Sequence, residues 1–112
     1  MRPIIKKHEH FRSPKLLALA NGAPCMNCGA EDGTIVAAHS NAGSDGKGMG
    51  IKADDACIAF LCRACHCYYD GDTENNPASW SDFGPITRQI VFLQALSKTY
   101  LWLLKNGKLK VS

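Results

Sequence analysis

The sequence predicts a single α+β domain, residues 1–112, that is stapled by zinc and framed by a short N-terminal helix and a long C-terminal helix. Three observations indicate this fold class. Two Cys-x-x-Cys pairs can share one metal ion, two short apolar runs have the length of strands, and the last part of the chain has helical periodicity. A chain of 112 residues has room for one modest core, so a metal staple suits its size.

A basic arm and a short helix are predicted at the start of the chain. Residues 1–12 are polar and basic and are expected to form the arm. Ser13 followed by Pro14 is typical of a helix start, because the hydroxyl can cap the first turn and proline suits the first helical position. We therefore expect a helix over residues 15–20 that ends before Gly22.

Two strands and a second helix are predicted next. A β-branched run over residues 34–39 favours a strand, and residues 56–61 form a second apolar stretch. The run Cys62-Arg63-Ala64-Cys65-His66 then opens a helix that continues to Asp70. With the first helix, these elements form the zinc-centred unit predicted for residues 13–71.

The segment between the predicted strands is rich in glycine. Residues 41–50 do not form a phosphate-binding loop of the Walker type, because Lys47 is followed by glycine in place of serine or threonine. The segment is interpreted as a flexible or closely approaching loop. Lys47 and Lys52 flank it and can contact phosphates, although an ordinary solvated loop explains them equally well.

A loop over residues 72–84 and a long helix over residues 85–106 complete the domain. The helix is expected to pack on the zinc-centred unit and to supply most of the core. Trp102 lies on its more polar side, where burial at the helix edge is favoured over an exposed self-association patch. The less polar side has residues recurring at helical spacing: Ile86, Ile90, Leu93, Ser97, Tyr100, Leu101 and Leu104.

Four cysteines carry the strongest signal. Two Cys-x-x-Cys pairs provide four thiolates at the spacing of a tetrahedral zinc site, and iron in a rubredoxin-like site is the alternative. Gly29 suits the reversing backbone after the first pair. Cys57 is expected to be a small buried hydrophobe, and Cys67 has no assigned role. The predicted ligands are Cys25, Cys28, Cys62 and Cys65.

A second group of residues has the composition of a catalytic metal site. His66 and Asp70 are four residues apart on a predicted helix, so they share a face and can bind one divalent ion. His39 ends the preceding strand and could activate a water as a general base opposite that ion. Taken singly, His39 could be a capping or loop histidine, and His66 a surface histidine or a further zinc ligand.

The net charge of +3 is mildly basic, with Lys and Arg gathered near both ends. Such ends suit a phosphate backbone and also suit ordinary solvated termini. The sequence contains neither a secretory signal nor an apolar run of about 20 residues that could span a bilayer. We therefore expect a cytoplasmic protein with no membrane partner, whose cysteines bind metal in preference to forming disulfides.

The order of these motifs resembles the HNH (ββα-metal) nuclease superfamily on a zinc-stapled, treble-clef scaffold. More narrowly, Ala38-His39-Ser40-Asn41, residues 46–55 and residues 61–66 are similar to small nucleases encoded by phages and prophages. The resemblance spans residues 10–71 and extends more loosely to the C-terminal helix. It implies a bacterial host, cleavage of double- or single-stranded DNA, a role in phage DNA processing or recombination, and phage or host recombination proteins as partners.

The resemblance also implies roles for individual residues. His39 takes the position of the general base, and His66 and Asp70 take the positions that hold a catalytic divalent cation, Mg²⁺ or Mn²⁺, beside the structural Zn²⁺. Residues expected to assist or to contact the substrate are Asn41, Lys47, Lys52, Asp54 and Asp55.

Two positions depart from the family pattern. The residue before the base is Asp or His in many HNH enzymes and is Ala38 here, and the central asparagine is replaced by Cys57. In one interpretation, water or a nearby polar side chain compensates, the candidates being Asn41, Asp54 and Asp55. In another, His39 is itself a metal ligand and a different group serves as the base.

The leading hypothesis is therefore a metal-dependent DNA endonuclease that hydrolyses phosphodiester bonds. The alternative is a non-catalytic, zinc-stapled module that binds DNA or another protein. The sequence does not indicate an oligomeric state.

Overall fold

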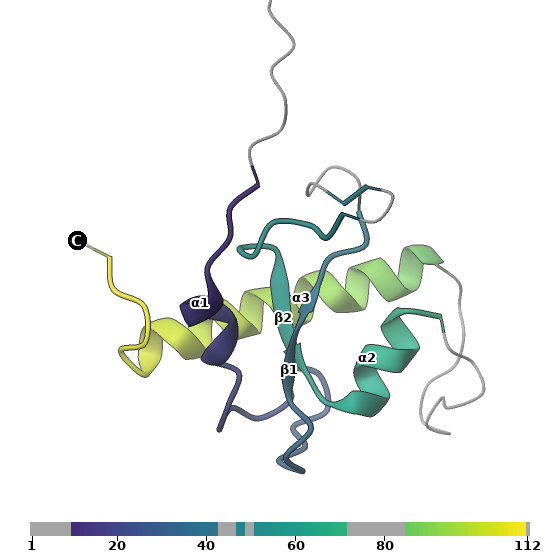
Figure 1. The fold of residues 1–112 in the computed structure, drawn as a ribbon. Coiled ribbons are helices and arrows are strands. Elements are labelled where there is room, and N and C mark those ends of the chain that lie inside the picture. Colours follow the sequence, from purple (N-terminus) through teal and green to yellow (C-terminus); the bar gives the residue numbers. More distant parts are fainter. Residues whose placement is uncertain (1–9, 43–46, 49–50, 72–84, 112) are drawn as a thin grey trace, which may run out of the picture.

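The computed structural model describes residues 10–42, 47–48, 51–71 and 85–111. Most of the predicted basic arm and the whole of the loop predicted for residues 72–84 lie outside these ranges. The elements in chain order are α1 (Pro14–Ala18), β1 (Val36–His39), β2 (Ile58–Leu61), α2 (Arg63–Tyr69) and α3 (Pro85–Lys105). Figure 1 shows the strands as a central hairpin, with α1 and α2 on either side and α3 crossing behind. The chain is a small α+β domain, as predicted.

Helix α1 begins as the sequence predicts. The Ser13 hydroxyl accepts a hydrogen bond from the Leu16 amide at 3.2 Å, and proline occupies the first helical position. The α-helix ends at Ala18, two residues earlier than expected, because the next amides bond to carbonyls three residues back. This tighter turn runs into Gly22, whose φ of 84° reverses the chain.

Strands β1 and β2 form an antiparallel hairpin in which His39 pairs with Ile58 and Val36 with Leu61. Both strands are two residues shorter than predicted. Before β1, the Asp32 carboxylate accepts hydrogen bonds from the backbone and the hydroxyl of Thr34, which prolongs the turn. Before β2, the Cys57 amide bonds back to the Asp54 carbonyl in another turn.

Helix α2 follows β2 without a connecting loop, since Cys62 is its N-cap. It ends at Tyr69, with Asp70 as the C-cap and Gly71 beyond it at a φ of 84°. The predicted helix therefore forms, and its direct connection to the hairpin sets the ββα order. In this order, a residue at the end of β1 and residues on α2 can face one another.

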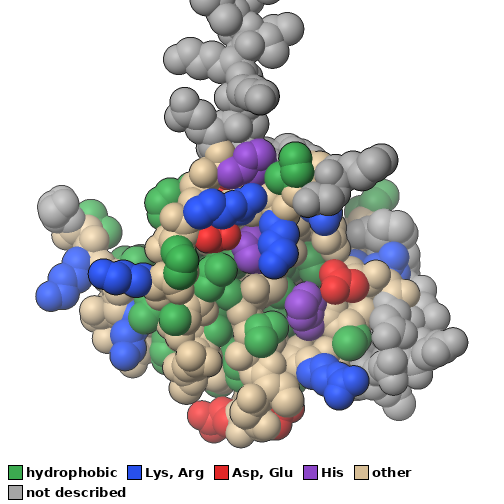
Figure 2. All heavy atoms as spheres, in the orientation of Figure 1, with side chains coloured by type: hydrophobic (Ala, Val, Ile, Leu, Met, Phe, Trp, Pro, Cys, Tyr) green, Lys and Arg blue, Asp and Glu red, His purple; other side chains and the backbone are tan. Residues whose placement is uncertain are grey.

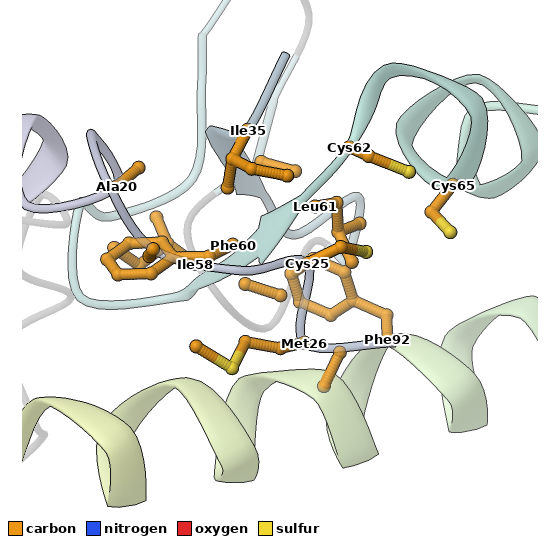
Figure 3. Packing of buried hydrophobic residues seen from close by; sticks show 14 of the residues in the cluster. Ala20, Cys25, Met26, Ile35, Ile58, Phe60, Leu61, Cys62, Cys65 and Phe92 are labelled. Carbon is orange, nitrogen blue, oxygen red and sulfur yellow. The ribbon is translucent and has the colours of Figure 1, made fainter. Parts of the chain in front are cut away.

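The core lies between the hairpin and α3, and β2 is buried along its whole length. The loop that carries the first cysteine pair is tied to β2, because the Met26 amide donates to the Phe60 carbonyl at 2.8 Å. Figure 3 shows Met26 and Phe92 in the same buried cluster, between this loop and α3. The helix thus packs on β2 and α2, within the range predicted for the unit that it was expected to cover.

The buried face of α3 is not the side on which the aliphatic residues recur at helical spacing. Phe92, Ala95, Thr99 and Leu103 are buried, whereas the regularly spaced aliphatic residues on the opposite side are exposed: Ile86, Ile90, Leu93, Leu101 and Leu104.

Two specific contacts hold α3 with this face inward. The Phe92 ring stacks on Tyr69 of α2, with centroids 4.3 Å apart, and the Thr99 hydroxyl accepts a hydrogen bond from the Phe60 amide at 3.0 Å. Trp102 is half-buried and lies edge-on to Phe60, with ring centroids 6.3 Å apart. Trp102 is therefore packed against the core at the helix edge, as predicted, but is only partly buried.

Candidate functional site

The four predicted zinc ligands come together in one cluster. All four sulfur atoms lie within 4.8 Å of one another, and the Cys28 and Cys62 sulfurs are 3.6 Å apart. Tetrahedral zinc with bonds of about 2.3 Å places its sulfur ligands about 3.8 Å apart, so the spacing fits this metal. The cluster can therefore hold a structural metal such as zinc: Cys25, Cys28, Cys62 and Cys65.

The backbone around the cluster already favours bound thiolates. The Cys28 amide lies 3.5 Å from the Cys25 sulfur, and the Asn27 side-chain amide lies 3.4 Å from the Cys65 sulfur. A hydrogen bond from Cys65 lowers the pKa of Cys25 to about 4, whereas burial raises the pKa of Cys62. A cation would offset the cost of charging the buried sulfurs, which is why such a set of thiols binds metal.

A groove of about 1080 Å³ crosses the face of the hairpin on the side of α1 and α2. Six of the predicted site residues line it, together with residues of α1. Figure 2 shows histidine, basic and acidic side chains gathered on this face. The six are His39, Asn41, Lys47, Lys52, His66 and Asp70.

His39 is held in one orientation by a buried carboxylate. Its Nε2 lies 2.8 Å from Oδ1 of Asp55, whose side chain is only 5% exposed. An ionised carboxylate only accepts hydrogen bonds, so Nε2 carries the proton and Nδ1 is left with a free lone pair. That is the tautomer in which His39 can accept a proton from water.

Asp55 is in turn held by the segment before α1. Its Oδ2 accepts a hydrogen bond from the Ser13 amide at 2.6 Å, and the Arg12 guanidinium lies 3.3 Å from Oδ1. Burial raises the pKa of Asp55, but hydrogen bonds from His39 and Ser13 and the charge of Arg12 outweigh burial and lower this pKa below its ordinary value. The carboxylate therefore stays ionised beside His39 at neutral pH.

His66 and Asp70 share one face of α2, as predicted. The His66 Nε2 lies 3.3 Å from Oδ2 of Asp70, and the side-chain amide of Asn41 donates to the other carboxylate oxygen at 3.3 Å. Asn41 is positioned by Tyr69. The Tyr69 hydroxyl accepts a hydrogen bond from the backbone amide of Asn41 at 2.7 Å and donates one to the side chain of Gln89 in α3. One imidazole, one carboxylate and one amide thus meet at the rim of the groove.

The two parts of the site remain separate. Among the described residues, the four cysteines are the only group of three or more His, Cys, Asp or Glu side chains close enough to hold one ion. His39 lines the same groove as His66 and Asp70 without joining them in such a group. This separation favours a general base on one wall of the groove and a pair of metal ligands on the other wall.

The structure also accounts for three of the less certain positions. Ala38 is 1% exposed in β1, so it faces the core, and a side chain there could not reach the groove. Asp54 accepts a hydrogen bond from the Phe11 amide at 3.1 Å and does not line the groove, which gives it a structural role. Asp55 is the residue that orients His39, a role for which the sequence offers it only as one of several candidates.

Comparisons of the chain with models of protein families, with curated proteins and with solved structures find no match. The site must therefore be interpreted from its own geometry. No helix in the described part of the chain is long and apolar enough to cross a membrane.

Two residues of the site have no signal in the sequence. Arg12 falls within the predicted basic arm, and Tyr69 falls within a predicted helix. Neither belongs to a recognisable motif, and each acts through contacts with residues distant in sequence. A basic residue just before a helix cap and a tyrosine beside a predicted ligand are too common to have identified them.

Proposed function

We propose that the chain is a metal-dependent endonuclease of the HNH type that hydrolyses phosphodiester bonds in DNA, on a treble-clef scaffold held by zinc. The observation that carries this proposal is the ββα order, which brings His39 and the His66–Asp70 pair to one groove while Asp55 sets the tautomer of His39. A general base and a cation site flanking one groove are the parts that phosphodiester hydrolysis requires.

The donor set on α2 suits a divalent cation. His66 and Asp70 offer a nitrogen and a carboxylate oxygen on adjacent turns, and Mg²⁺ or Mn²⁺ is commonly held by few protein ligands with water and substrate phosphate completing the shell. When bound, the cation would neutralise charge on the phosphate and its leaving oxygen. Asn41 keeps the Asp70 carboxylate oriented.

The remaining residues of the groove would bind and activate the reactants. Lys47 and Lys52 line the groove and can pair with phosphates on either side of the scissile bond. The Nδ1 atom of His39 takes a proton from a water molecule as the water oxygen attacks phosphorus. The bond from phosphorus to the leaving oxygen then breaks, and Asp55 stabilises the imidazolium that forms.

Cleavage of supercoiled plasmid by the purified chain with Mg²⁺ or Mn²⁺ tests the proposal. His39→Ala should lower the rate about 10²- to 10⁴-fold, as expected for loss of a general base. His66→Ala should abolish metal-dependent cleavage, and His10→Ala, a histidine that does not line the groove, should leave the rate nearly unchanged. Circular dichroism and zinc content confirm folding of each variant.

A parent chain that binds DNA in a salt-dependent manner and cuts none of it with any divalent ion would contradict the proposal. The chain would then be the non-catalytic module that the sequence leaves as the alternative. Equal cutting by the parent, His39→Ala and His66→Ala would show that the groove is not the active site. Cleavage of linear single-stranded DNA, assayed in parallel, would identify the preferred substrate.

A further inference from the structure

The outer face of α3 carries an aliphatic stripe that nothing in the described chain covers. Its five members, which we call the α3 stripe, are all 46% exposed or more, and one reaches 79%. Together they present on the order of 500 Å², which is as large as the biggest apolar patch on an ordinary monomer. The α3 stripe consists of Ile86, Ile90, Leu93, Leu101 and Leu104.

The spacing of the α3 stripe matches a helix-pairing seam. With Ser97 in the gap, successive positions are separated by four, three, four, four and three residues, close to the alternation of three and four in a coiled coil. The stripe runs the length of a 21-residue helix, about 31 Å at 1.5 Å per residue. A long straight seam of this kind fits another helix better than it fits a groove or a flat surface.

We propose that the α3 stripe is the interface of a homodimer in which two α3 helices pair antiparallel. When the helix is reversed about the middle of the stripe, each position falls within one residue of another position of the stripe, so the stripe is complementary to itself, as a two-fold interface requires. In the antiparallel register, Ile86 faces Leu104 of the other copy, and Ile90 faces Leu101.

Ser97, the small residue in the gap of the stripe, favours the antiparallel direction of pairing. Leu93 meets Ser97 of the other copy, which places a large side chain against a small one. A parallel pair would instead oppose the two serines and leave a gap in the middle of the seam. The antiparallel arrangement is therefore the better packed of the two.

The charges beside the stripe are compatible with this pairing. The sequence has no acidic residue after Pro85, so the lysines beside the stripe have no acidic partner within α3 itself. In the antiparallel register, Lys98 lies nearest Gln94 of the other copy, and Lys105 nearest Thr87. The lysines of the two copies are thus kept apart, and Lys98 has an amide oxygen to bond.

The area is sufficient for a stable pair. Two copies would remove about 1,000 Å² of aliphatic surface, and flanking residues would bring the total to the range of about 1,200 to 2,000 Å² seen in specific interfaces. The stripe lies on the exposed side of α3, opposite the buried side that packs on the hairpin, whereas the groove lies on the side of α1 and α2. Figure 1 shows α3 crossing behind the hairpin. Pairing through the stripe therefore leaves the groove open.

Sedimentation velocity of the zinc-loaded full chain over a range of concentrations tests the dimer. The parent should sediment with twice its 12.2 kDa mass. Ile90→Glu or Leu101→Glu should raise the dissociation constant about a hundredfold or more, because each buries a charge in the seam. Val111→Glu makes the same change at an 87% exposed position outside α3 and should leave the dimer intact.

The direction of pairing has its own test. Ile90→Lys combined with Leu101→Glu should restore the dimer that either change alone abolishes, because the new charges oppose each other only in the antiparallel register. A parent chain that remains monomeric overturns the proposal and leaves the stripe to a helix of another protein. A parent dimer that Ile90→Glu and Leu101→Glu do not weaken overturns it as well.

Discussion

At the scale of single residues, Asp55 determines what His39 can do. It lies in the turn before β2 and accepts a hydrogen bond from Nε2 of a histidine at the end of β1. An asparagine in its place could also donate a hydrogen bond to Nε2. The imidazole could then adopt the other tautomer, in which the proton is on Nδ1. Carboxylate chemistry at this position is therefore as important to the proposed reaction as the histidine.

Asp55→Asn is expected to lower DNA cleavage about 10²-fold or more while the fold persists, since a base in the wrong tautomer cannot accept a proton. Initial rates of plasmid nicking measure the effect. Asp54→Asn is the matched control, because that neighbouring carboxylate bonds the Phe11 amide and does not line the groove. Equal losses in both variants would show that the effect is structural.

Asp55 should also make stability depend on pH. Because its pKa is below the ordinary value of 3.8, the ionised form stabilises the fold. This contribution is complete above the ordinary pKa and is lost as the pH falls through the lowered one. Urea unfolding at several pH values should show the parent losing more stability on acidification than Asp55→Asn, whereas parallel curves would contradict the assignment.

At the scale of elements, α3 shows where periodicity is insufficient. The helix is apolar on two sides, and the sequence favours the side with the regular aliphatic spacing. The structure buries the other side, where Ala95 and Thr99 allow close approach and the Thr99 hydroxyl reaches the Phe60 amide. Hydropathy ranks threonine low, so no pattern of apolar residues could have identified this contact.

Thr99→Val should destabilise the domain by about 1–3 kcal/mol, because it leaves the buried Phe60 amide without an acceptor. Thr99→Ser keeps the hydroxyl and removes one methyl group, so its cost should be about 1 kcal/mol. Chemical denaturation of both variants gives the comparison. A valine variant as stable as the serine variant would mean that the hydrogen bond does not hold α3 in place.

Other elements were predictable because their signals are local. Ser13-Pro14 encodes the start of α1, and the Cys-x-x-Cys spacing encodes the four-cysteine cluster that could hold a metal. The pairing of His66 with Asp70 follows from helical spacing alone. The pairing of His39 with Asp55 depends on the path of the chain between β1 and β2, which no spacing rule describes.

At the scale of the whole molecule, the four-cysteine cluster joins the two halves of the fold. One cysteine pair precedes β1, and the other opens α2 after β2. Structural zinc contributes about 10–16 kcal/mol in small domains, as much as or more than the whole stability of about 5–15 kcal/mol of a typical protein. The fold and the groove should therefore be lost together when the metal is removed.

Cys62→Ser should reduce bound zinc and melt the domain at 37 °C, whereas Cys67→Ser, a cysteine outside the cluster, should leave both unchanged. Zinc content by mass spectrometry and helicity by circular dichroism report the two effects. A chelator should unfold the parent in the same way. A metal-free chain with native helicity would contradict a structural role for the cluster.

The groove and the α3 stripe lie on opposite sides of the hairpin. This arrangement determines the order in which nicked and linear plasmid should form. In a pair of copies joined through α3, the two grooves face outward, away from each other, and cannot grip opposite strands of one duplex at neighbouring sites. Each cut would be an independent event. Open circular plasmid should accumulate first, linear plasmid should form only after a second random nick, and one dimer could hold two DNA segments together.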